Sequence, residues 1–125
     1  MLPVIMAHSP AGASTMQMIH FGQVARAWLF RKFDFGAYNF QHYGQLYPPL
    51  YNLARVRAPV FMYHSANDWM ATPMDVQLLV NQLPNVRLQY LVPFTWFNHL
   101  DFVWAINVRS LVYDRLLQSI RSMDE

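Results

Sequence analysis

Asp68 and His99 are the residues of this sequence whose types and spacing best fit catalytic chemistry. Asp68 follows an apolar run that ends near residue 64, and His99 follows an alternating run over residues 86–92. A carboxylate that holds one imidazole nitrogen leaves the other nitrogen able to take a proton from a serine hydroxyl. The pair therefore fits the acid and the base of a serine hydrolase triad. A single Asp or His in a loop is usually structural, so the argument depends on the elements that carry them.

The second half of the chain predicts two βα units that share a parallel sheet. Residues 59–63 form a continuous apolar run, as expected of a parallel strand buried on both faces. Thr72 to Asp75 supply an N-cap, a proline and a capping acid for a helix that ends before Pro84. Residues 86–92 alternate and predict a strand with one wetter face. A last helix carries on one face Val108, Leu111, Val112, Leu116 and Ile120.

This order of elements predicts an α/β fold in which the two candidate loops meet. Functional side chains of an open α/β sheet lie on the loops beyond the carboxyl ends of its strands. Neighbouring parallel strands would bring the loop of Asp68 beside the loop of His99. The chain order, with the acid before the histidine, also fits the order Ser, Asp, His of the α/β-hydrolases.

The first half is less regular. A helix is expected to begin near Thr15, with Ser14 as N-cap and Gln17 completing a capping box. Residues 33–51 are rich in Gly, Pro, Asn and Tyr and predict a mostly irregular segment, in which Pro48-Pro49 excludes a helix.

A serine nucleophile is harder to assign. The sequence contains no Gly-x-Ser-x-Gly pentapeptide, and Gly12-Ala-Ser14-Thr-Met16 is the nearest approach. A short apolar run precedes it and a helix follows, but Met16 stands where a small residue is required. Ser14 is therefore better explained as an N-cap than as a nucleophile.

Two acids and the histidines have competing interpretations. Asp101 lies close to His99 and could orient its ring, although capping of the final segment explains it better. Asp75 is explained by its capping position. The five histidines lack metal-ligand spacing, so no metal is expected, and no other cofactor is implied.

The composition favours an incomplete domain over a well-packed aromatic one. The chain is 54% hydrophobic and 13% charged, against about 25% charged in average globular proteins. Its nine Lys and Arg residues are scattered, so no nucleic-acid partner is expected. The absence of cysteine excludes disulfide and zinc-thiolate chemistry. The opening Met-Leu-Pro-Val-Ile-Met-Ala is too short for a signal sequence, and no run is long enough for a membrane span.

Six segments resemble, in order, the C-terminal region of the acid lipase family, the gastric and lysosomal acid lipases of the α/β-hydrolase superfamily. The sequences of these segments look most similar to those of insect members, and the resemblance runs from about Pro3 to Leu117. The most specific motifs are Asn67-Asp-Trp-Met-Ala71 and Asn98-His-Leu-Asp-Phe-Val-Trp104. The others are His8-Ser-Pro-Ala-Gly-Ala-Ser-Thr15, His20-Phe-Gly-Gln23, Phe33-Asp-Phe-Gly36 and Tyr47-Pro-Pro-Leu-Tyr-Asn-Leu53.

The resemblance implies that Asp68 is the triad acid and His99 the triad base. Family members hydrolyse triacylglycerols and sterol esters through an acyl-serine intermediate, in a lysosome, a gut lumen or a secretion. Their nucleophile elbow, oxyanion donors and most of the lid lie upstream of the resembling region. The resemblance thus implies the C-terminal part of an α/β-hydrolase fold. Residues 58–125 would form its βαβα part, and residues 1–57 the end of the cap with a connecting segment. One departure is Ser65-Ala66, where many members have two glycines, which predicts a slightly stiffer loop.

The leading hypothesis is a lipase fragment that supplies Asp68 and His99 and is inactive alone for lack of the serine. Its partners would be a lipid ester, the missing N-terminal part and, transiently, a lipid interface. Trp69, Met70, Trp96 and Phe97 could line an acyl-chain pocket, with core packing as the alternative. A second hypothesis is a non-catalytic remnant that pairs with a full-length lipase through its sheet edge. A third is a minimal esterase that uses Ser14.

Overall fold

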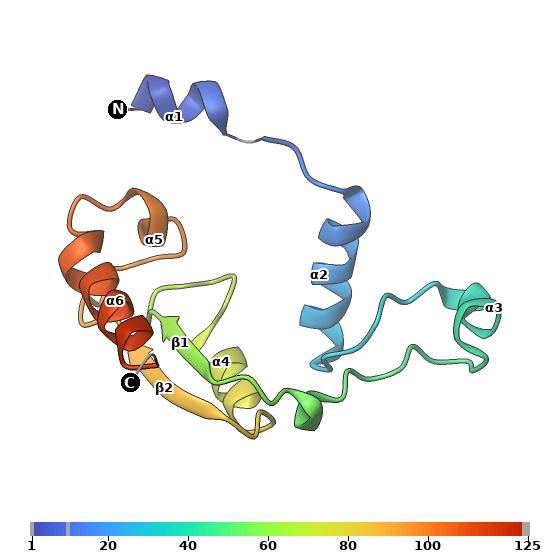
Figure 1. Ribbon diagram of the computed structural model, residues 1–125. Coiled ribbons are helices and arrows are strands. Elements are labelled where there is room, and N and C mark those ends of the chain that lie inside the picture. The colour runs from blue at the N-terminus through green and yellow to red at the C-terminus, as the bar shows by residue number, and fades with distance from the viewer. Residues whose placement is uncertain (1, 10, 124–125) are drawn as a thin grey trace. The chain divides into compact units, whose positions relative to one another are not determined.

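The computed structural model describes residues 2–9 and 11–123, which fall into two compact units divided between Tyr51 and Asn52. The first unit contains α1 (Leu2–His8), α2 (Thr15–Ala27), η1 (Gly36–Tyr38) and α3 (Asn39–Tyr43). The second contains η2 (Leu53–Arg55), β1 (Val60–His64), α4 (Pro73–Val80), β2 (Val86–Leu91), α5 (Asp101–Trp104), the π-helical segment η3 (Arg109–Tyr113) and α6 (Asp114–Arg121) (Figure 1). Within the described residues, no helix is long and apolar enough to cross a bilayer.

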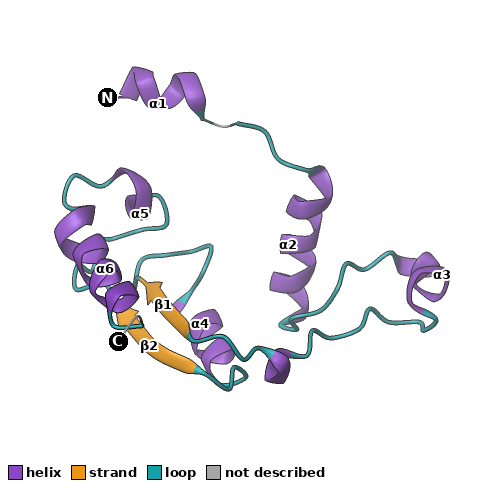
Figure 2. Cartoon of the chain, viewed as in Figure 1, coloured by secondary structure: helices purple, strands orange, loops and turns teal. Residues whose placement is uncertain are grey.

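The second unit is built on the parallel pair β1 and β2, as the sequence predicts (Figure 2). Phe61 pairs with Leu88 and His64 with Leu91, after an irregularity between Val60 and Phe61. Burial alternates along β2, which confirms the predicted wetter face. β1 is only partly buried over most of its length, because the sheet has two strands in the described part of the chain. This mixed α/β arrangement is compatible with a piece of an α/β-hydrolase fold.

The crossover between the two strands begins with the predicted capping box. Thr72 Oγ1 accepts a hydrogen bond from the backbone N–H of Asp75 at 3.3 Å, and Asp75 Oδ2 accepts one from the N–H of Thr72 at 3.1 Å. Pro73 occupies the first turn, where its missing N–H would have no partner in any case. These contacts fix the point at which the loop of Asp68 becomes helix α4.

A small apolar core lies beyond the end of β2 and under the last helical segments. Its buried members are Val92, Phe97, Val108 and Val112, with Tyr63, Tyr90, Phe102, Ala105 and Leu111 packed against them. The predicted single apolar face of the last helix holds for its first half, but Ile120 is exposed. The π-helical turn η3 adds a residue to the helical repeat, so the face of α6 is rotated relative to the residues before it.

The capping box predicted for α2 is absent. The helix begins at Thr15 as expected, and Ser14 is extended, with φ −65° and ψ 129°, but its side chain makes no capping hydrogen bond. The first residues of α2 are exposed. Water can therefore satisfy the N–H groups of the first turn, and nothing forces the hydroxyl toward them.

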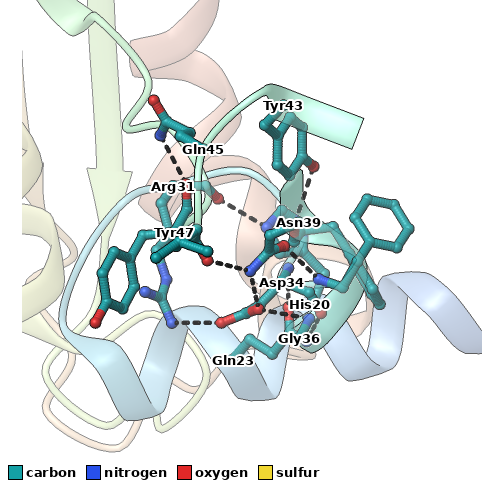
Figure 3. A network of polar contacts seen from close by, with 12 residues as sticks. His20, Gln23, Arg31, Asp34, Gly36, Asn39, Tyr43, Gln45 and Tyr47 are labelled. Atoms are coloured by element: carbon teal, nitrogen blue, oxygen red, sulfur yellow. Dashed lines mark hydrogen bonds and ion pairs between the residues drawn. The ribbon is translucent and has the colours of Figure 1, made fainter. Parts of the chain in front are cut away.

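A polar network organises residues 31–47 of the first unit (Figure 3). Most of these residues lie in the segment 33–51, for which the sequence predicts a mostly irregular structure. The buried Asn39 amide donates to Asp34 Oδ1 at 2.8 Å and to the Leu46 carbonyl at 3.0 Å. Gln23 bonds both backbone groups of Asp34, at 2.8 and 2.9 Å. Hydrogen bonds from Asn39 and the Gly36 N–H lower the pKa of Asp34. The network stabilises the short helix α3, whereas the Pro48-Pro49 segment is irregular as predicted.

We expect the isolated chain to bind a hydrophobic dye and to lack a single cooperative thermal transition. Large apolar side chains are exposed in both units, and the outer edge of β1 has no partner strand among the described residues. Exposed apolar patches and open strand edges favour association. Dye fluorescence, size-exclusion chromatography and calorimetry measure this, with the urea-unfolded chain as the control. A sharp transition from a monodisperse monomer would contradict the expectation.

Candidate active site

The carboxyl ends of β1 and β2 bring two loops together. The ladder extends past the strands through a 2.8 Å hydrogen bond from the Val92 N–H to the His64 carbonyl. The chain then leaves β1 into residues 65–71 and leaves β2 into residues 93–100. Asp68 lies in the first loop and His99 in the second.

Asp68 is a buried carboxylate whose two oxygens have different partners. Only 4% of the residue is exposed. Oδ1 accepts hydrogen bonds from the backbone N–H groups of Met70 and Ala71, both at 2.9 Å, and Oδ2 contacts His99 Nδ1 at 2.9 Å. Burial acts to raise the pKa of Asp68, but the hydrogen bonds from Ala71, His99 and Met70 outweigh it, and the pKa lies below its ordinary value. Asp68 is therefore ionised at neutral pH.

The ionised Asp68 determines the tautomer of His99. A carboxylate can only accept, so Nδ1 of His99 carries the proton that lies between them. In the neutral ring the lone pair is then on Nε2, which can act as a base. The side chain of His99 is 48% exposed, so the ring is accessible. The predicted contact between Asp68 and His99 is thus present.

The segment around His99 is fixed by its neighbours on both sides. Phe97 is completely buried and meets the ring of Phe102 edge-on, with the ring centroids 4.9 Å apart. Asp101 Oδ2 accepts from the Asn98 N–H at 2.8 Å, and Asn98 Oδ1 accepts from the Leu100 N–H at 2.9 Å. Asp101 thus closes the turn over residues 98–101, and Asp68 rather than Asp101 holds the ring of His99.

The other predicted site residues divide into exposed and buried ones. Trp69 is 88% exposed and Trp96 73% exposed, and Met70 is also exposed. These three lie in the same two loops as Asp68 and His99. Phe97 belongs to the core, where its completely buried ring supports the loop of His99.

Sequence reasoning gave no role to two polar residues at the end of β1. Ser65 is completely buried and His64 nearly so, and Ser65 Oγ and His64 Nδ1 have no hydrogen-bond partner among the described residues. Burial lowers the pKa of His64. No local sequence pattern marks these two positions, because their burial arises from packing between distant segments.

The curated proteins to which this chain is similar are named lipases. No family model matches the chain. Lipase 3 of Drosophila melanogaster is 46% identical over 125 residues, which cover 99% of this chain and 32% of the relative. Human gastric triacylglycerol lipase is 36% identical over 121 residues, or 95% of the chain and 30% of the relative. Human lysosomal acid lipase/cholesteryl ester hydrolase is 35% identical over 116 residues, or 91% and 29%.

The chain belongs to the acid lipase family. It spans about a third of the length of the curated relatives that it matches.

The segment around Ser14 differs from the nucleophile elbow of a serine hydrolase. An elbow is a strand, a sharp turn carrying the serine, and a helix. Here residues 2–8 form helix α1 rather than a strand, and Met16 replaces the small residue that the turn needs.

Among the described residues, no group of three His, Cys, Asp or Glu side chains could hold a metal ion.

We expect Asp68→Asn to reverse the tautomer of His99. The N–H groups of Met70 and Ala71 require an acceptor at the position of Oδ1. The asparagine must therefore place its oxygen there and turn its NH₂ toward His99, whose Nδ1 then accepts while Nε2 carries the proton. The ¹⁵N NMR spectrum of the labelled imidazoles measures this in a chimera in which these residues replace the matching segment of Lipase 3.

Asp75→Asn is the matched control, because Asp75 is the capping carboxylate that follows the same loop. It should leave the His99 signals unchanged. A proton that stays on Nδ1 in Asp68→Asn would contradict the assignment of the Asp68–His99 hydrogen bond.

Proposed function

We propose that this chain contributes the acid and the base of a Ser-His-Asp triad in a carboxylic ester hydrolase that acts on triacylglycerols or sterol esters. The single observation that carries the proposal is the 2.9 Å contact between His99 Nδ1 and Asp68 Oδ2 at the ends of neighbouring parallel strands. The relatives are named triacylglycerol lipase and cholesteryl ester hydrolase, which supports the substrate class. The serine and the oxyanion donors would come from the rest of the hydrolase, with this chain as the C-terminal part of its fold.

In this proposal His99 transfers protons and Asp68 maintains its orientation. Nε2 takes the proton of the serine hydroxyl as the serine oxygen attacks the ester carbonyl. The ionised Asp68 stabilises the imidazolium that forms. The C–O bond to the alcohol breaks as Nε2 returns the proton to the leaving oxygen, which gives an acyl-serine. A water molecule then attacks by the same route, and the fatty acid leaves with the serine restored.

The low pKa of Asp68 keeps the acid of the proposed triad ionised in a mildly acidic medium. The pKa of Asp68 is lowered, so the carboxylate keeps its charge as the pH falls toward the ordinary range of carboxyl groups. The stability that this ionised group contributes is present above its unfolded-state pKa and is lost as the pH falls through the lower folded-state value. The gastric and lysosomal names of the relatives support a secreted or lysosomal location for the proposed hydrolase.

The exposed apolar side chains beside the pair suit a lipid substrate. Trp69, Met70 and Trp96 present large apolar groups from the same loops as Asp68 and His99. We propose that they contact the acyl chain or the lipid interface. Phe97 would act indirectly, by supporting the loop from the core.

We expect the Lipase 3 chimera to hydrolyse a long-chain triacylglycerol, and Asp68→Asn or His99→Ala to abolish most of this activity. In the serine protease that serves as the general template, loss of the carboxylate reduces kcat by about 10⁴-fold through the wrong tautomer. Initial rates of fatty acid release measure kcat and KM. Asp75→Asn again serves as the control and should keep the activity. Full activity in Asp68→Asn would support the non-catalytic role instead.

We expect the isolated 125-residue chain to release no fatty acid above a buffer blank. It has no Gly-x-Ser-x-Gly elbow, and the nucleophile and the oxyanion hole supply most of the acceleration in such enzymes. A short-chain chromogenic ester gives the sensitive assay, with Ser14→Ala as the paired variant. Turnover that disappears in Ser14→Ala would contradict the proposal and assign the nucleophile to Ser14.

A further inference from the structure

Asn67 forms a hydrogen bond between the two loops of the candidate site. Its side-chain Nδ2 donates to the backbone carbonyl of Trp96 at 3.1 Å. Asn67 directly precedes Asp68, and Trp96 lies three residues before His99. The bond therefore spans the same gap as the Asp68–His99 contact, from the residues next to it.

Each of the two loops is held firmly by its own contacts. The N–H groups of Met70 and Ala71 close the first loop onto Asp68. In the second loop, the N–H of Phe97 donates to the carbonyl of Phe94 at 2.9 Å. On either side of His99, the N–H of Asn98 donates to the Asp101 side chain and the N–H of Leu100 donates to the Asn98 side chain. None of these contacts joins one loop to the other.

The ring of His99 is poorly fixed by packing, because nearly half of its side chain is exposed. Its position relative to Asp68 depends on how the second loop sits against the first. Among the described residues, the hydrogen bonds that cross between residues 65–71 and 93–100 are the Asp68–His99 contact and the bond from Asn67 to Trp96. Since the His99 ring gains and loses a proton in the proposed reaction, a second bond that involves no titrating group would preserve the alignment of the two loops.

We propose that Asn67 is a positioning residue for the Asp68–His99 pair. Its side-chain amide holds the loop of His99 at the distance at which Nδ1 stays bonded to Asp68 and Nε2 stays directed to the substrate side. This inference rests on the proposed function for its effect on catalysis. Its effect on the His99 ring is independent of catalysis.

The chain offers a matched control at the opposite end of the same two strands. Asn85 precedes β2, and its Nδ2 donates to the carbonyl of Arg57, before β1, at 2.8 Å. The bond has the same chemistry as that of Asn67 and also joins the two βα units. Loss of either bond should destabilise the unit similarly, but only Asn67 lies beside the pair.

The test compares Asn67→Ala with Asn85→Ala in the Lipase 3 chimera. We expect Asn67→Ala to lower kcat about tenfold or more with little change in KM, since a displaced catalytic group slows the chemical step more than it weakens binding. In ¹⁵N NMR the His99 ring should change from a single Nδ1–H tautomer to a mixture. Asn85→Ala should leave both kcat and the His99 signals unchanged, even where its thermal midpoint falls as far.

Asn67→Leu keeps the branched shape and the number of side-chain heavy atoms without the donor, so it repeats the test if the alanine variant does not fold. Equal changes in Asn67 and Asn85 variants, or an unaltered His99 tautomer without Asn67, would overturn the positioning role. Failure of the proposed function looks different. There, His99→Ala would retain activity, while the NMR comparison would still report on Asn67.

Discussion

The parallel ladder between β1 and β2 is the constraint on which the site depends. The pairing runs from the bond between Val60 N–H and the Asn85 carbonyl to that between Val92 N–H and the His64 carbonyl. Parallel strands end at the same edge of the sheet, so the ladder brings together two loops that are distant in sequence. A slip of one residue would turn every side chain of β2 to the other face. Backbone hydrogen bonds therefore bring the loops of Asp68 and His99 together before either side chain contributes.

Within that frame, the buried charge of Asp68 dictates the conformation of its loop. A carboxylate removed from water is strongly destabilised unless donors surround it. The N–H groups of Met70 and Ala71 turn back to Oδ1, and the His99 ring approaches Oδ2. The need of the buried carboxylate for hydrogen-bond donors thus closes the turn, lowers the pKa of Asp68 and selects the tautomer of His99. The same contacts that stabilise the loop leave Nε2 as the nitrogen of the neutral His99 ring that can accept a proton.

The predictions that the structure confirms rest on local sequence patterns. The Thr72-to-Asp75 cap, the alternation over residues 86–92 and the parallel order of the strands were sufficient to place Asp68 beside His99. The predictions that failed depended on solvent and on distant partners. Ser14 occupies the predicted N-cap position, but its side chain makes no capping bond, because water can satisfy the N–H groups of an exposed helix start. Helix α3 forms through hydrogen bonds of Asp34 and Asn39 that the periodicity of the sequence does not indicate. Asn67 bonds a backbone carbonyl 29 residues away, which its side-chain type alone does not reveal.

The distribution of apolar side chains leads to the same proposal as the chemistry. In the described part of the chain, the buried core contains Val92, Phe97, Val108 and Val112, although 54% of the sequence is hydrophobic. Many tryptophans, methionines and leucines outside that core are exposed in both units. Large exposed apolar areas in soluble proteins mark surfaces that bind another protein or a lipid. In the proposed triad, the Nε2 atom of His99 likewise needs a serine hydroxyl as its partner. We infer that one larger hydrolase fold both buries these apolar side chains and supplies the serine. Further strands paired with β1 would extend the sheet, and their loops would lie at the same edge as His99.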